Sequence, residues 1–115
     1  MSEINGALSG LKIVACSTAQ AGTVPYMLMA DLGAEVIKIE TPGKGDNNRN
    51  SGFLEGEIGS FFETNNRGVK SLTLNLKSEN GQKILHSLIK DADVFGQNFR
   101  PGVAKKLNFD YETLS

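Results

Sequence analysis

The fold is decided by Asp31-Leu32-Gly33-Ala34-Glu35-Val36-Ile37-Lys38-Ile39-Glu40. Gly33 suits the left-handed conformation that often ends a helix, because glycine has no Cβ to clash there. The residues from Val36 to Ile39 are β-branched except for Lys38, which is typical of a strand covered on both faces. A helix that leads into such a strand predicts an earlier parallel strand upstream.

That upstream strand is predicted at residues 11–16, which are apolar apart from Lys12. A helix between the two strands is predicted from apolar residues at helical spacing, namely Val24, Met27, Leu28 and Leu32. Pro25 fits the first turn of this helix, with Thr23 as its N-cap. Residues 11–40 therefore predict one β-α-β unit.

The next segment, residues 41–52, is rich in glycine, proline, asparagine and aspartate, which favour turns over helix or strand. We expect an irregular loop that continues to about Glu63 and is functional, because long loops inside compact domains usually are. In this loop, Arg49 can contact a phosphate or pair with Asp46, and we favour the pair, because exposed pairs are common. Glu40, at the end of the strand, is expected to accept hydrogen bonds from backbone N–H groups.

A second β-α-β unit is predicted from residue 70 onward. Residues 70–76 alternate apolar and polar side chains, which predicts a strand. Ser78 is the expected N-cap of a helix whose apolar residues share one face, namely Ile84, Leu85, Leu88 and Ile89. A fourth strand is predicted at 92–97, followed by a turn at 98–102 and a helix at 103–107. The fold class is therefore α/β, with a Rossmann-like, doubly wound, mostly parallel sheet.

Ligands of such sheets bind beyond the carboxyl ends of the strands, near a switch in strand order. These ends are predicted at residues 17–22, residues 40–45, Lys77 and residues 98–102. All four segments are polar or rich in turn-forming residues. The architecture therefore predicts one binding site formed by these segments.

The composition limits the class of protein. The chain has 115 residues, a net charge of -1 and one cysteine, Cys16. This length predicts one domain, and the charge gives no sign of a nucleic-acid or anionic-membrane partner. A single cysteine excludes an internal disulfide, and Cys16 is expected to be buried. With no signal-peptide pattern and no apolar run of about 18 residues, we expect a cytoplasmic protein without a membrane partner.

Eight short motifs occur in an order that resembles the amino-terminal part of class III CoA-transferases. This family includes formyl-CoA transferase, carnitine CoA-transferase and α-methylacyl-CoA racemase. The motifs are Leu8 to Val14, Gln20-Ala21-Gly22, Ala30 to Glu40, Pro42 to Arg49, Asn66 to Ser71, Leu74 to Lys77, Ala92-Asp93-Val94 and Asn98-Phe99-Arg100-Pro101-Gly102. Each motif is weak alone, but together they extend over nearly the whole chain.

The resemblance implies a CoA-binding, Rossmann-like domain and an interlocked homodimer. It also implies an enzyme that moves CoA between an acyl-CoA and a small carboxylic acid through an aspartyl-CoA thioester, without a metal. The family's nucleophilic aspartate lies beyond residue 115. We therefore expect residues 1–115 to be the amino-terminal part of that domain, with no catalytic residue and no activity alone. The alternatives are an acyl-CoA racemase or isomerase of the same family, or a catalytically inactive CoA-binding half-domain.

The same resemblance assigns CoA contacts by position, and coenzyme A is the expected ligand. The matching residues are Gln20, Ala21, Thr41, Leu74, Asn75, Leu76, Lys77, Asn98, Phe99, Arg100 and Lys106. Cations and free N–H groups suit the phosphates of CoA, and an apolar or aromatic wall suits its adenine. Two positions depart from the family pattern: Thr23 stands where many members have proline, and Thr41 where formyl-CoA transferase has arginine.

Other proteins share this architecture, because a fold does not determine a function. A receiver domain needs acidic residues after the first strand, where this chain has Cys16 and Ser17. A dinucleotide-binding unit needs G-x-G-x-x-G there, which is absent.

Some candidate residues also have plainer explanations. Phe99 can be a core residue under the turn, and Arg67 and Lys70 can be solvated cations.

Overall fold

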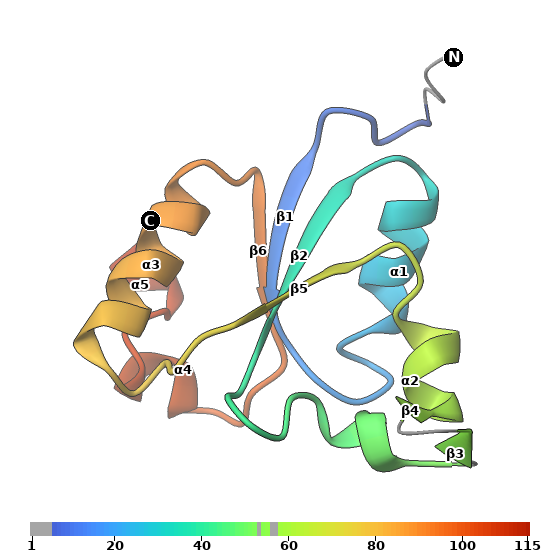
Figure 1. Cartoon of the computed structure of the whole chain (residues 1–115). Coiled ribbons are helices and arrows are strands. Elements are labelled where there is room, and N and C mark those ends of the chain that lie inside the picture. The colour runs from blue at the N-terminus through green and yellow to red at the C-terminus, as the bar shows by residue number, and fades with distance from the viewer. Residues whose placement is uncertain (1–5, 53, 56–57) are drawn as a thin grey trace.

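The structure, a computed structural model, describes residues 6–52, 54–55 and 58–115. It contains a four-stranded parallel sheet with helices on both faces (Figure 1). In chain order the elements are β1 (Lys12–Cys16), α1 (Val24–Asp31), β2 (Glu35–Glu40), the 3-10 helix η1 (Asn47–Asn50), β3 (Leu54–Glu55), β4 (Ile58–Gly59), α2 (Ser60–Asn65), β5 (Lys70–Thr73), α3 (Glu79–Lys90), β6 (Val94–Gln97), α4 (Val103–Lys106) and α5 (Tyr111–Leu114).

The strand order β5-β2-β1-β6 confirms the predicted doubly wound sheet. From β1 the chain adds β2 and then β5 on one side, and it returns to place β6 on the other side of β1. Val14 of β1 pairs with Ile37 of β2 and with Phe95 of β6, so these three strands lie in register at the centre. The strand order therefore switches between β1 and β6, where α/β sheets usually bind ligands.

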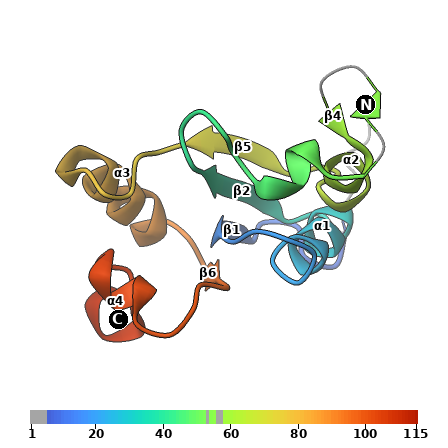
Figure 2. The same ribbon diagram turned by 90° about the horizontal axis from the view of Figure 1, so that it is seen from below.

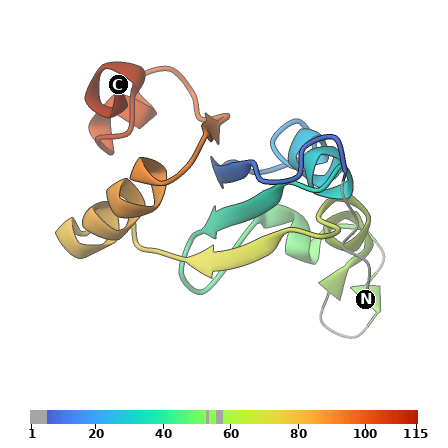
Figure 3. The same cartoon turned by 90° about the horizontal axis from the view of Figure 1, so that it is seen from above.

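Both faces of the sheet are covered, because successive side chains of a strand point to opposite faces. On one face, Val14, Cys16 and Ile39 pack with Leu85 of α3 and with Phe109. On the other face, a second cluster joins sheet residues to α1, and its members are Ile13, Ala34, Val36, Tyr26, Met29 and Ala30. The views from below and above show α1 and α2 on one side of the sheet and α3 on the other (Figures 2 and 3).

The predicted helix boundaries follow from local chemistry. Gly33 has φ 101°, so it adopts the left-handed conformation that ends α1. Thr23 is at the N-cap of α1 with Pro25 in the first turn, but its hydroxyl donates to the Ala19 carbonyl at 2.7 Å instead of capping. Ser78 caps α3 as predicted, since its hydroxyl accepts from the Gly81 N–H at 3.0 Å.

The predicted strand 70–76 is too long, because β5 ends at Thr73. The Leu74 N–H donates to the Glu40 carbonyl at 3.1 Å, and the chain then turns, with the Ser78 N–H bonded to the Asn75 carbonyl. Leu74 is nevertheless buried. The alternation of apolar and polar residues therefore continues past Thr73, the last residue of β5, because it follows burial and not strand pairing. The predicted segments 92–97 and 103–107 differ from β6 and α4 by one or two residues at one end.

The predicted loop 41–63 is more ordered than its composition indicates. Asp46 accepts from the Asn48 N–H at 2.9 Å and so caps the single turn η1, and α2 begins at Ser60. Aspartate and asparagine favour turns, but they also cap short helices, which explains the wrong prediction. Residues 53, 56 and 57 of this segment lie outside the described residues.

Candidate functional site

A groove of about 490 Å³ lies at the carboxyl edge of the sheet. It is formed where the chain leaves β2, β5 and β6, together with one face of α4. Its lining residues are Thr41, Pro42, Leu74, Asn75, Leu76, Lys77, Phe99, Val103 and Leu107. Three strand ends therefore meet at one concave surface, because parallel strands end at the same edge.

The wall of the groove is mainly apolar. Phe99 packs on Phe109, with ring centroids 5.6 Å apart, so it belongs to the core and also lines the groove. Val103 at the start of α4 and Leu107 just after its end also line the groove, and neither was predicted as a site residue. Their spacing of four residues places them on one helix face, and this signal is present in the sequence. Such a wall suits a flat or flexible apolar group.

The groove wall also includes polar residues from the turn after β5. The Asn75 side-chain carbonyl accepts from the Lys77 N–H at 3.1 Å, which closes a tight turn after β5. Asn75 and Lys77 are both exposed. The turn therefore presents an ammonium group beside the apolar wall, where it can meet an anion.

The loop after β1 is joined to the loop after β6 by Asn98. Its side-chain oxygen accepts from the Thr18 N–H at 3.0 Å, and its amide donates to the Thr18 carbonyl at 2.7 Å. These two hydrogen bonds hold the loop after β1, with its exposed residues Gln20 and Ala21, at the same edge of the sheet as the groove. Asn98 thus connects the two strand ends at the switch in strand order.

Six of the eleven predicted CoA contacts line the groove, namely Thr41, Leu74, Asn75, Leu76, Lys77 and Phe99. The other five, Gln20, Ala21, Asn98, Arg100 and Lys106, lie in neighbouring segments and do not line it. Arg100 and Lys106 are exposed, before and within α4. The groove therefore gathers the contacts predicted at β2 and β5 together with Phe99 after β6, whereas the contacts predicted after β1 and the remaining ones after β6 lie outside its wall.

A polar cluster surrounds Glu40, the last residue of β2, directly before Thr41. Arg49 donates two hydrogen bonds to the Glu40 carboxylate, at 2.7 and 3.0 Å, and the Asp46 N–H donates a third at 2.9 Å. Ser71 donates a fourth. Burial alone would raise the pKa of Glu40, but the bonds from Arg49, Ser71 and Asp46 lower it to about 2.

The predicted pair of Arg49 with Asp46 is therefore wrong. Arg49 binds Glu40, and its guanidinium carbon lies 3.9 Å from the ring centroid of Phe62. Asp46 is instead fully buried and pairs with Lys38, whose ammonium also donates to the Asn66 side chain at 2.9 Å. The lysine that interrupts the apolar run of β2 is thus the partner of the loop, which the sequence did not reveal.

These two ion pairs position the loop after β2. Its backbone closes with a hydrogen bond from the Gly45 N–H to the Thr41 carbonyl at 2.9 Å. Because Glu40 and Lys38 belong to a buried strand, the loop is attached to the rigid part of the fold. Thr41 and Pro42 are consequently held against the groove.

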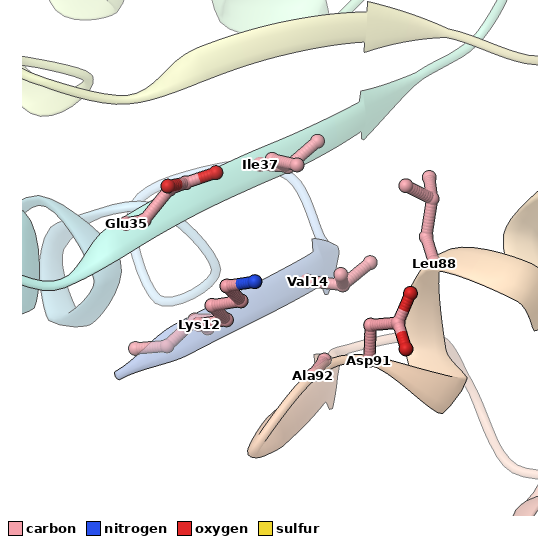
Figure 4. A pocket seen from close by; sticks show the side chains of 8 residues that line it. Lys12, Val14, Glu35, Ile37, Leu88, Asp91 and Ala92 are labelled. Atoms are coloured by element: carbon pink, nitrogen blue, oxygen red, sulfur yellow. The ribbon is translucent and has the colours of Figure 1, made fainter. Parts of the chain in front are cut away.

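A smaller cavity of about 170 Å³ lies at the opposite, amino-terminal edge. Lys12, Glu35 and Asp91 surround it, with Ile37 and Leu88 on its apolar side (Figure 4). Since α/β sheets bind ligands at their carboxyl edge, this cavity is not the candidate site.

Within the described ranges, no three His, Cys, Asp or Glu side chains are placed to hold a metal ion. None of the described helices has the length and apolar character needed to cross a membrane.

Comparison with known proteins agrees with this architecture. The sequence pattern of CoA-transferase family III matches residues 8–115. The acetyl-CoA:oxalate CoA-transferase of Acetobacter aceti is 40% identical over 96% of this chain, and the human succinyl-CoA:glutarate CoA-transferase is 38% identical over 93%. A crystal structure of a CaiB/BaiF family protein from Brucella suis superimposes with a TM-score of 0.89 at 37% identity, over 96% of this chain and 30% of that one.

This chain spans only 28% of the Acetobacter enzyme and 25% of the human enzyme. The match nevertheless extends from before β1 to the end of the chain, and it includes every segment that forms the groove. The chain belongs to CoA-transferase family III.

Proposed function

We propose that the groove binds the CoA part of an acyl-CoA, and that the protein moves CoA between an acyl-CoA and a small carboxylic acid. The observation that carries the proposal is that six predicted CoA contacts, from the ends of three strands, line one groove. The names of the relatives, such as acetyl-CoA:oxalate CoA-transferase, support the reaction class. They favour transfer over racemisation, which remains the alternative within the family.

The chemistry of the groove fits this ligand. Leu74, Leu76 and Phe99 offer an apolar wall to adenine or to the pantetheine chain, and Asn75 offers an amide for hydrogen bonds. Lys77 adds a cation to the groove wall, which suits a pyrophosphate. In this proposal Gln20, Ala21, Asn98, Arg100 and Lys106 act at the mouth, because their segments adjoin the groove at the same edge of the sheet.

The groove offers binding groups for the ligand. Of the described residues that line it, none carries a carboxylate. A carboxylate is what an aspartyl-CoA intermediate requires. We therefore propose that this chain contributes binding, and that the aspartate of the covalent step is supplied from outside residues 1–115. An interlocked homodimer and a cytoplasmic location complete the proposal.

Isothermal titration calorimetry with CoA tests the binding step. We expect saturable binding that Lys77→Met weakens about three- to tenfold, since an exposed charge contact contributes roughly 1 kcal/mol. Lys12→Met is the matched control, because it removes the same charge at the opposite edge of the sheet. Absence of heat at millimolar CoA, or an equal loss in both variants, would contradict the proposal.

Transfer is tested separately. The chain is incubated with an acyl-CoA and a carboxylic acid, and the CoA esters are separated by chromatography. We expect no turnover by residues 1–115 alone, because no described residue in the groove wall carries a carboxylate. Turnover by the purified chain would contradict the assignment of the covalent step to another segment.

A further inference from the structure

A second depression, of about 260 Å³, adjoins the groove on the side of the loop after β2. Its lining residues are Glu40, Thr41, Gly43, Lys44, Gly45, Arg49, Ser71 and Thr73. Thr41 lines both the depression and the groove, so the two form neighbouring parts of one surface. The groove wall is mainly apolar, whereas the depression is lined by hydroxyl groups, backbone and charged side chains.

The loop geometry places Lys44 at the rim of this depression. Gly43 and Gly45 on either side of it have φ of 82° and 65°, a conformation that other residues adopt only with strain. A Cβ on Gly45 would also lie 2.8 Å from the Arg49 side chain and 3.1 Å from the Glu40 carboxylate. Glycine at this position therefore lets the loop fold tightly over the Glu40–Arg49 pair, with Lys44 between two sharp turns.

The charges favour an anion. Glu40 contributes a negative charge, but its carboxylate is already occupied by four hydrogen bonds and its side chain is only 2% exposed. Arg49 offsets that charge and remains 32% exposed. Within residues 6–52 and 58–115, Lys44 forms no ion pair, and it is exposed. The side chains that line the depression therefore sum to about one positive charge.

Hydrogen-bond donors are present beside this charge. Thr41 and Thr73 are exposed, and their hydroxyls stand at the ends of the neighbouring strands β2 and β5. A phosphomonoester has a charge of about -1.5 to -2 and three acceptor oxygens, which suits one ammonium group and two hydroxyls. A carboxylate would use fewer of these donors.

We infer that this depression is a phosphate subsite, in which Lys44, Thr41 and Thr73 hold the 3′-phosphate of CoA. The inference rests on the proposed function, because it assigns one end of the ligand bound in the groove. The apolar wall would receive the adenine and pantetheine parts, and the depression would receive the terminal phosphate. Lys44 then gives the site a preference for CoA over dephospho-CoA.

The test compares CoA with dephospho-CoA by calorimetry, in the wild type and in Lys44→Met, Lys44→Arg and Lys12→Met. We expect Lys44→Met to weaken CoA binding about three- to tenfold and to change dephospho-CoA binding less than about twofold. Lys44→Arg should keep the preference for CoA, and Lys12→Met should leave both affinities unchanged. Added salt should reduce the preference in the wild type, because an exposed contact is screened. Inorganic phosphate should compete with CoA and leave dephospho-CoA binding unchanged.

The outcomes separate this inference from the proposed function. Suppose that CoA binds, but Lys44→Met weakens the binding of CoA and dephospho-CoA equally or changes neither. The phosphate subsite is then wrong, and the assignment of the groove to CoA stands. If neither ligand binds the wild type, both are overturned. A circular-dichroism melt of each variant identifies any loss that comes from unfolding, and Lys44 is exposed in a loop, so its replacement should leave the melting temperature unchanged.

Discussion

Replacing Asp46 by alanine should remove a large part of the stability of this domain. Asp46 is fully buried, and it accepts hydrogen bonds from the Lys38 ammonium and from the Asn48 N–H. Lys38 is 3% exposed. In the variant, its remaining partners among the described residues are the Asn66 side chain and the Phe62 ring, whose centroid lies 5.4 Å away. An ammonium ion in that state has lost its counter-charge and has little access to water.

Breaking a buried ion pair by removing one partner costs about 3–5 kcal/mol, and loss of the Asn48 cap adds up to about 1 kcal/mol. We therefore expect Asp46→Ala to reduce the free energy of unfolding by about 4 kcal/mol. A domain of this size usually has about 5–15 kcal/mol in total. Asp46→Asn keeps an oxygen for the Asn48 N–H and tests the charge alone. Lys38→Met combined with Asp46→Ala removes both charges and should cost less than the two single changes together.

Urea unfolding, followed by far-ultraviolet circular dichroism, measures these differences. Asp31→Ala is the control, because it breaks an exposed ion pair with Arg67 and should leave the stability nearly unchanged. If Asp46→Ala costs no more than Asp31→Ala, the Lys38–Asp46 pair does not hold the loop. If the single costs add up in the double variant, the two side chains are not coupled.

Three further outcomes are expected. Gly96→Ala should destabilise the fold by about 1–3 kcal/mol, because its Cβ would lie 1.7 Å from the Tyr26 hydroxyl; an unchanged thermal melt would contradict this close approach. Cys16 should resist alkylation at pH 8 until urea unfolds the chain, since burial raises its pKa to about 12, and rapid labelling of the native protein would be the opposite result. Glu40 has a pKa of about 2 in the fold and an ordinary value of 4.5, so its contribution to stability is present above pH 4.5 and is lost as the pH falls toward 2. Glu40→Gln should reduce the pH dependence of the unfolding free energy between pH 2 and 4.5. An unaltered pH dependence would show that Glu40 does not contribute in this way.

Part of the candidate site could be predicted from the sequence. The turn-rich segments after the strands pointed to the carboxyl edge, and the resemblance to class III CoA-transferases named eleven positions there. Six of them line the groove. Val103 and Leu107 were missed as lining residues, although their spacing already placed them on one helix face. All eleven stay predictions as CoA contacts. Five of them, Gln20, Ala21, Asn98, Arg100 and Lys106, do not line the groove.

Local patterns alone determined the framework. The glycine after α1, the serine before α3 and the β-branched run of β2 each act through neighbours a few residues away, so spacing along the chain was sufficient to predict them. The ion pairs could not be predicted in this way. In the sequence, Lys38 only interrupts an apolar run, and Arg49 was predicted to pair with Asp46. The loop after β2 instead folds back, so that Lys38 pairs with Asp46 eight positions away and Glu40 with Arg49 nine positions away. Only the tertiary structure decided those partners, because burial makes an unpaired charge too costly and the path of the loop determines which opposite charge lies within reach.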